Sequence, residues 1–191
     1  MTLCIFLVVS CSDRCDRCVP PPEVCVQYHP KRDAAIEAKD WARLEKEARY
    51  YTSTCDGWFD NGVANGYADL SMALRHLNRL DEAYVEAGRG IITTYKEPNP
   101  HLEKAKVLIA QKKYTEAEQE LTVAESLAKQ AIKERDRIDK IPSYPPIELN
   151  SPADKWRKSQ RLRHQNSLKA VEECKATLPS KRKANLPYQH R

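Results

Sequence analysis

The segment that decides the fold is Leu80-Asp81-Glu82-Ala83, which recurs 34 residues later as Tyr114-Thr115-Glu116-Ala117. The residues around the two segments follow one spacing of three and four. The first series is Tyr67, Leu70, Leu74, Leu77, Leu80, Ala83 and Ala87, and the second is His101, Lys104, Leu108, Gln111, Tyr114, Ala117, Leu121 and Ala124. Such spacing is typical of one face of an α-helix. A period of 34 residues with two helical segments in each unit predicts a stack of helix pairs.

This pattern resembles the tetratricopeptide repeat (TPR), whose signature is W-x2-L-G-x2-Y…A-x3-F…P. Ala83 and Ala117 match the small residue that lets the second helix of a pair approach the first. Leu80 and Tyr114, three positions earlier, are expected to fill the wedge between the helices. The resemblance implies an all-α fold, a right-handed α-solenoid of about three TPR-like helix pairs plus a C-terminal capping helix.

The match to the signature is partial. Ser71 and Ala105 stand where the TPR signature has glycine, and Ala87 and Leu121 stand where it has an aromatic residue. What the resemblance implies about function is a binding surface, because a TPR scaffold binds other polypeptides and its fold does not name the ligand.

Charge is unevenly distributed along the 191 residues, although the net charge is only +5. Residues 151–191 contain eleven Lys and Arg against three Asp and Glu, whereas residues 1–150 contain 21 against 24. A basic C-terminal region on a mildly acidic body favours anionic partners.

The first ten residues are apolar and uncharged, and they end in Val8-Val9-Ser10-Cys11. This segment resembles the lipobox of bacterial lipoproteins. The resemblance implies removal of residues 1–10, lipidation of Cys11, and an outer-membrane location facing the periplasm, because Ser12 rather than Asp follows the cysteine. No Lys or Arg precedes Arg14, so the basic start of a signal peptide is missing. The alternative is a buried N-terminal segment in a cytoplasmic protein.

Five of the seven cysteines lie within the first 25 residues: Cys4, Cys11, Cys15, Cys18 and Cys25. Cys15-Asp-Arg-Cys18 has the C-x2-C spacing of redox and zinc sites, but no second C-x2-C and no βαβ pattern accompanies it. Disulfides that pin the N-terminal segment, for example Cys25 with Cys55, are the favoured interpretation.

Residues 11–31 are expected to form a Cys- and Pro-rich tether, with Val19-Pro-Pro-Pro22 as a stiff spacer. The helical repeat domain is expected over 32–140, and its first helix pair over 32–54 places Trp41 in a wedge position. The turn-rich insertion 52–62 presents Trp58 and Phe59, which either contact a ligand or plug a gap between repeats.

Two further helix pairs are expected at 63–78 with 80–94 and at 100–112 with 114–138. Asn99 is the expected N-cap of the third of these helices, with Pro100 at its first position. A Pro-rich connector (141–152), a basic capping helix (153–178) and a disordered basic tail (179–191) complete the chain. The apolar seam of the capping helix consists of Trp156, Leu162, Leu168, Val171 and Cys174.

Catalytic and cofactor-binding motifs are absent from the sequence. It contains no G-x-x-x-x-G-K-[ST], G-x-G-x-x-G, H-E-x-x-H or G-x-S-x-G, and its five histidines are scattered. We therefore expect no enzymatic activity, no cofactor and no metal.

The favoured hypothesis is a non-enzymatic, lipid-anchored TPR-type adaptor that binds a peptide or protein partner in its concave groove. The expected groove residues mix two cations, an acid and apolar groups, which suits a polypeptide ligand: Asn65, Asp69, Met72, Arg75, His76, Lys106 and Ile109. One alternative is a soluble basic protein whose C-terminal helix binds nucleic acid. Another is a redox or metal protein that uses Cys15 and Cys18.

Overall fold

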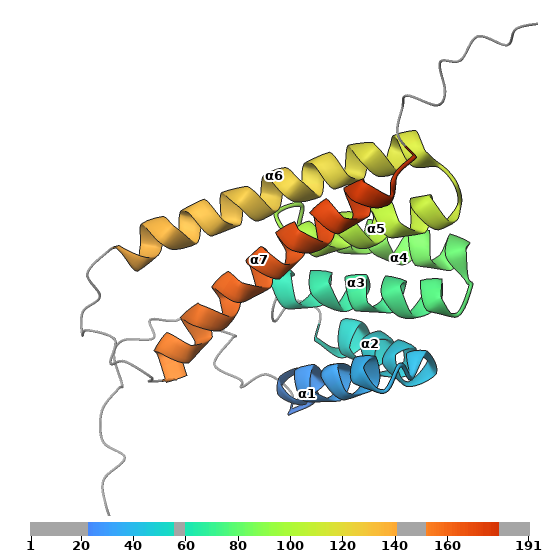
Figure 1. Cartoon of the computed structure of the whole chain (residues 1–191). Coiled ribbons are helices and arrows are strands. Elements are labelled where there is room, and N and C mark those ends of the chain that lie inside the picture. The colour runs from blue at the N-terminus through green and yellow to red at the C-terminus, as the bar shows by residue number, and fades with distance from the viewer. Residues whose placement is uncertain (1–22, 56–59, 141–151, 180–191) are drawn as a thin grey trace, which may run out of the picture.

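The computed structural model describes residues 23–55, 60–140 and 152–179, and all its regular elements there are helices (Figure 1). The helices are α1 (Glu23–Glu37), α2 (Trp41–Thr54), α3 (Asp60–His76), α4 (Leu80–Thr93), α5 (Pro98–Ala110), α6 (Tyr114–Asp139) and α7 (Pro152–Thr177). No helix in this part of the chain is long and apolar enough to cross a membrane.

Helices that follow one another pack together, from α1 against α2 through to α5 against α6. The first helices of the second and third pairs, α3 and α5, also contact each other, whereas α7 packs on α5 and α6. Figure 1 shows α7 running diagonally across the stack in front of α3 and α5. The fold class is therefore the expected one: three TPR-like helix pairs with a C-terminal capping helix.

The turn inside each pair is built in the same way. Lys39, Asn78 and Lys112 have positive φ angles of 53°, 61° and 61°. The residue after each donates its N–H to a carbonyl five positions earlier, as Asp40 does to Ala35 at 2.9 Å. This is the Schellman arrangement, which ends the first helix and starts the second after a single left-handed residue.

The small residues of the repeat lie where the pattern predicts. Ala83 and Ala117 are completely buried, and Leu80 is partly buried against the core. Tyr114 is 39 % exposed and borders a hollow next to α7, so its expected role in the wedge is wrong.

Helix α1 begins at Glu23, so the tether predicted for residues 11–31 does not extend past residue 22. Cys25 and Tyr28 are buried in the core, and this burial explains the earlier start. Pro30 lies inside the helix, where it removes one backbone hydrogen bond without ending it. Helix α3 also begins early, at Asp60 rather than residue 63.

The predicted N-cap of α5 is wrong. The helix begins at Pro98 after Glu97, because a proline at the first position needs no hydrogen-bonded N–H. The side chain of Asn99 is used in tertiary hydrogen bonds instead.

The capping helix buries a shorter apolar seam than expected. Val171 is fully buried beside Leu102 and Leu121, and Cys174 packs partly against them, but Leu162 is 56 % exposed. Several predicted features lie outside the described residues: the leader with Cys11, Cys15 and Cys18, the pair Trp58 and Phe59, most of the Pro-rich connector (141–151), and the tail after residue 179.

Candidate binding face

The seven predicted groove residues lie on α3 and α5, which with α1 form the face that α7 crosses (Figure 1). We refer to it as the α1–α3–α5 face. The structure divides the seven residues into two groups: two are buried in contacts between helices, and five lie nearer the surface.

Asp69 joins α1 to α3 and is not open to a ligand. Its side chain accepts a hydrogen bond of 2.9 Å from the Tyr28 hydroxyl and pairs with Arg32 Nε at 2.8 Å. Burial raises the pKa of Asp69, although the Arg32 guanidinium opposes this shift. The residue therefore holds the first helix pair on the second, and its assignment to the ligand groove is wrong.

Asn65 is also buried, as the centre of a polar network that includes α7. Its amide donates to Glu97 at 3.0 Å, and its carbonyl oxygen accepts from Asn99 at 2.6 Å. Ser167 of α7 donates to Asn99 at 2.7 Å, and Arg163 of α7 lies 3.5 Å from Glu97. Burial raises the pKa of Glu97, and the nearby Arg163 lowers it. The assignment of Asn65 to an open groove is therefore wrong, because α7 covers this part of the face.

The other five residues remain half-buried or exposed near the C-terminal ends of α3 and α5: Met72, Arg75, His76, Lys106 and Ile109. His76 stacks on Trp41, with ring centroids 3.8 Å apart and planes only 5° from parallel. Burial and the adjacent Arg75 lower the pKa of His76. An aromatic surface therefore borders the open part of the face.

Glu103 connects the two predicted cations. It pairs with Arg75 at 3.3 Å and with Lys106 at 2.6 Å, and it is only 6 % exposed. We call this group the Arg75–Glu103–Lys106 cluster. Glu103 is not among the residues predicted from the sequence, although its position three residues before Lys106 on a helix indicates such a pair. Trp41 is predicted from the sequence only as a packing residue.

The open part of the face offers one unit of net positive charge, an aromatic pair and two aliphatic side chains, Met72 and Ile109. Such a surface suits a polypeptide, which carries apolar, polar and charged groups along one chain. Among the described residues, no group of His, Cys, Asp and Glu is arranged to hold a metal ion.

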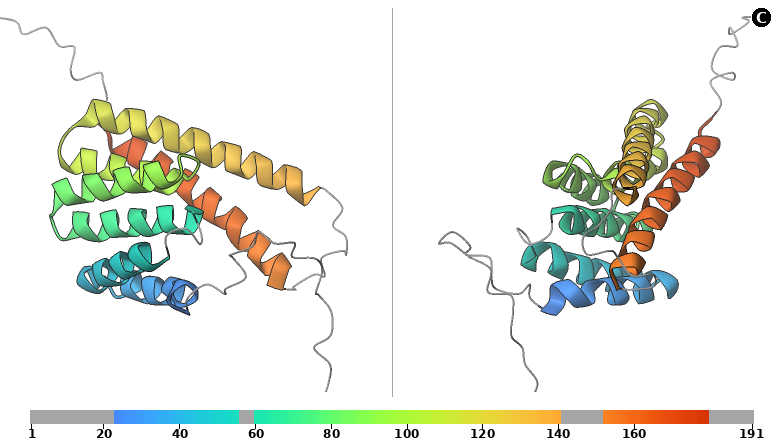
Figure 2. Two further views of the ribbon diagram at one scale, coloured as in Figure 1. Left: turned by 180° about the vertical axis from the view of Figure 1, so that it is seen from behind. Right: turned by 90° about the vertical axis from the view of Figure 1, so that its left-hand side faces the viewer.

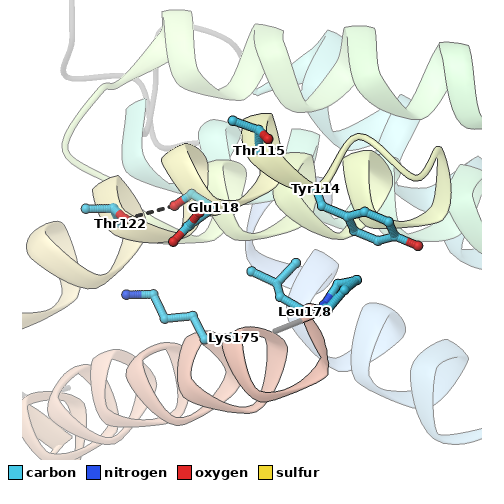
Figure 3. A pocket seen from close by; sticks show the side chains of 7 residues that line it. Tyr114, Thr115, Glu118, Thr122, Lys175 and Leu178 are labelled. Carbon is cyan, nitrogen blue, oxygen red and sulfur yellow. Dashed lines mark hydrogen bonds between the residues drawn. The ribbon is translucent and has the colours of Figure 1, made fainter. Parts of the chain in front are cut away.

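A separate hollow of about 330 Å³ lies between the start of α6 and the end of α7 (Figure 3). One side of the hollow is lined by Tyr114, Thr115, Glu118 and Thr122, and the other side by Lys175, Leu178 and Pro179. The Thr122 hydroxyl donates to the backbone carbonyl of Glu118, and Lys175 pairs with Glu125. The hollow includes none of the predicted groove residues.

The basic residues of α7 are largely paired within the protein. Lys158 pairs with Asp154 at 2.9 Å, Arg163 with Glu97, and Arg161 with Asp136 of α6 at 2.5 Å. These pairs reduce the positive field that nucleic-acid binding would need from this helix.

Cys25 at the start of α1 and Cys55 at the end of α2 form a disulfide, with Cα atoms 5.8 Å apart. This is the pair named from the sequence. Cys174 is a half-buried free thiol, and burial raises its pKa.

No protein-family model matches the chain, and no curated protein matches its sequence. Its structure is similar to the TPR2B domain of yeast Sti1, solved as a complex with pHsp70, with a TM-score of 0.50 and 15% identity over 75% of this chain and 97% of that one. The chain has a TPR-like fold. It is also similar to PcrH from Pseudomonas aeruginosa, with a TM-score of 0.48 and 16% identity over 79% and 93% of the two chains.

A third solved structure, the Yersinia enterocolitica type III secretion chaperone SycD with a peptide of the translocator YopD, has a TM-score of 0.47 and 17% identity. It covers 78% of this chain and 93% of that chain. At these identities the likeness concerns the fold alone.

Proposed function

We propose that the protein is a non-enzymatic TPR-type adaptor that binds a peptide or protein partner on the open part of its α1–α3–α5 face. The observation that carries this proposal is the convergence of the Trp41–His76 stack, the Arg75–Glu103–Lys106 cluster, Met72 and Ile109 from three different helices. These side chains lie at one end of the face, and all of them except the buried Glu103 keep partial exposure.

The partner contacts the end of the face near the C-terminal ends of α3 and α5. At the other end, α7 is fixed by the network of Asn65, Glu97, Asn99 and Ser167. A partner that lay along the whole face would have to displace this helix. A short segment of polypeptide fits without displacement.

We further propose that Cys11 is lipidated and anchors the scaffold to the bacterial outer membrane, facing the periplasm. The apolar leader and the Val8-Val9-Ser10-Cys11 segment support this location. The Cys25–Cys55 disulfide supports it independently, because disulfides persist in oxidising compartments such as the periplasm.

Site-specific photo-crosslinking in bacterial cells tests the binding face. Benzoylphenylalanine replaces His76 or Ile109 at the open end, and Tyr50, an exposed residue of α2, serves as the control position. We expect covalent adducts of defined mass from His76 and Ile109 and none from Tyr50. Equal adducts from all three positions, or none from the face, would contradict the proposal.

A variant that removes all three charges of the Arg75–Glu103–Lys106 cluster extends the same experiment. Replacing Arg75 and Lys106 alone would leave Glu103 buried without a counter-ion and destabilise the protein. The matched change is therefore Arg75→Gln, Glu103→Gln and Lys106→Gln together. We expect loss of the Ile109 adduct while the melting temperature stays within a few degrees of the wild type.

A further inference from the structure

The second half of α6 and the first half of α7 project beyond the rest of the molecule. Figure 1 shows both segments reaching past the ends of the stacked helices, on the side where α1 begins, and the reverse view agrees (Figure 2, left). Arg161 of α7 pairs with Asp136 of α6 at 2.5 Å and so connects the two segments. We call residues 129–140 and 152–163 the α6–α7 arm; Figure 2 (right) views the molecule from this end.

The α6–α7 arm is strongly basic. It contains ten Lys and Arg against four Asp and Glu, whereas the rest of the chain contains 22 against 23. Two of its cations pair with carboxylates outside the arm, Glu125 and Glu97. Ten cations against these six carboxylates leave a net charge of +4. Three lysines of the arm are exposed: Lys133, Lys140 and Lys155.

The end of the molecule from which the arm projects also exposes apolar side chains. Among the described residues, the three most exposed large apolar side chains are Ile92 at 87 %, Tyr95 at 69 % and Val26 at 63 %. Val26 lies in the first turns of α1, whereas Ile92 and Tyr95 lie where α4 ends, after running back along α3 to this end. Cations together with exposed apolar side chains are typical of surfaces that bind at the headgroups of a bilayer.

This end is also the one that the proposed lipid anchor would hold near the membrane. Helix α1 begins there at Glu23, and eleven residues, 12–22, separate it from Cys11. Eleven residues span at most roughly 40 Å, so an acylated Cys11 keeps this end close to the bilayer. The open part of the α1–α3–α5 face lies at the opposite end, near the C-terminal ends of α3 and α5 (Figure 1).

We propose that the α6–α7 arm binds the anionic lipid headgroups of the membrane surface and so turns the open part of the binding face away from the bilayer. The choice of a membrane as partner rests on the proposed lipid anchor, because nucleic acid would attract the same cations. An anchor at residue 11 limits the distance of the scaffold from the membrane, and contact through the arm adds its orientation. The contact is electrostatic, so it weakens as salt is added.

Co-sedimentation with lipid vesicles tests the arm. The parent protein is the full chain with Cys11→Ala, so that no acyl chain contributes to binding. The vesicles consist of phosphatidylcholine alone or of an equal mixture with the anionic lipid phosphatidylglycerol, in low salt. We expect the parent to bind the mixed vesicles much more strongly than phosphatidylcholine alone, and to be released as the salt concentration rises.

Two variants of equal net charge locate the contact. The arm variant carries three changes at exposed lysines of the arm: Lys133→Gln, Lys140→Gln and Lys155→Gln. The control variant carries three changes at exposed lysines of the turns inside the helix pairs, at the opposite end: Lys39→Gln, Lys112→Gln and Lys113→Gln. The arm variant should lose at least about tenfold in its partition coefficient for the mixed vesicles, with an unchanged circular dichroism spectrum, and the control variant should bind like the parent.

Three outcomes overturn the proposal. The parent may bind both kinds of vesicle equally, or the two variants may lose the same affinity, which would show that the arm has no special role. Tighter binding of the parent to duplex DNA than to the mixed vesicles at the same salt concentration would assign the arm to nucleic acid. Because the parent carries no acyl chain, none of these outcomes depends on whether Cys11 is lipidated in cells, which the intact mass of the wild type decides separately.

Discussion

At the scale of single residues, the three left-handed turns show how local conformation sets the repeat. Lys39, Asn78 and Lys112 occupy a region of backbone conformation that glycine adopts without cost and other residues adopt at a cost of about 1 kcal/mol. The chain uses lysine or asparagine at these positions, so each turn retains a small strain.

Replacing Lys112 by glycine should relieve this strain and stabilise the protein by about 0.5 to 1 kcal/mol. The free energy of unfolding in urea is the measurement. Lys113→Gly is the matched control, because Lys113 has a φ of −89° and gains nothing from glycine. Destabilisation by Lys112→Gly as large as that by Lys113→Gly would show that the turn is not left-handed in solution.

His164 of α7 should lower the free energy of unfolding of the protein in acid. It is 8 % exposed, and burial together with Arg163 and Arg135 lowers its pKa to about 4, from an ordinary value near 6.5. Between pH 6.5 and 4 the unfolded chain therefore binds a proton that the folded chain excludes, and stability from this group falls as the pH falls.

His164→Gln should remove this part of the pH dependence. The free energy of unfolding of the variant, compared with that of the wild type at pH 7, 5.5 and 4.5, should show a smaller decline below pH 6.5. Parallel curves for the two proteins would contradict the assigned role of His164.

The roles of individual polar side chains were harder to predict from the sequence than the helices that carry them. The helical register of Asp69 and Asn65 predicts that both face the groove. Their partners Tyr28, Arg32 and Glu97 lie 32 or more residues away in the chain, and the spacing within one helix does not reveal such distant pairs. Arg75 and Lys106, which helical register alone places on one face, do meet through Glu103, whereas the binding role of the residues at this end stays a prediction.

At the scale of elements, the Cys25–Cys55 disulfide joins the start of the first helix pair to its end. Helix α1 packs most closely on α2, its side chains Tyr28 and Ala35 share apolar clusters with α3, and Asp69 of α3 bonds to Tyr28 and Arg32. A crosslink between residues 30 apart in sequence should contribute about 3 kcal/mol, largely by restricting the unfolded chain.

Cys25→Ser with Cys55→Ser should lower the free energy of unfolding by about that amount, measured by chemical denaturation. Dithiothreitol should destabilise the wild type to a similar degree and leave the double variant unchanged. Cys174→Ser, which removes the half-buried free thiol, is the control with a small effect. Equal stability of the double variant and the wild type would show that α1 is held by its other contacts.

Helix order and the positions of the turns could be predicted because they depend on local spacing, as in the 34-residue recurrence of Ala83 and Ala117. The start of α1 could not be predicted from the sequence, because Pro20 to Pro22 and Pro30 suggest extended chain. In the structure, burial of Cys25 and Tyr28 in the core extends the helix back to Glu23. Helix α5 likewise begins at Pro98 rather than at Pro100, and the side chain of Asn99 forms a hydrogen bond with Ser167 of α7 instead of capping the helix.

At the scale of the whole molecule, the helix pairs form a scaffold with three distinct surfaces: the open end of the α1–α3–α5 face, the part of that face covered by α7, and the basic α6–α7 arm. An adaptor at a membrane requires a fourth feature, an attachment that keeps the scaffold in place. The leader and Cys11 are proposed to supply it, with about 0.8 kcal/mol of membrane affinity for each methylene buried.

The most direct test of a membrane-anchored binding scaffold is the intact mass of the protein, expressed with its native N-terminus in a bacterial host beside a Cys11→Ala variant. We predict that the wild type loses residues 1–10 and gains the mass of acyl chains, and that the variant shows neither change. An unprocessed, unacylated wild-type chain would contradict anchoring at the envelope.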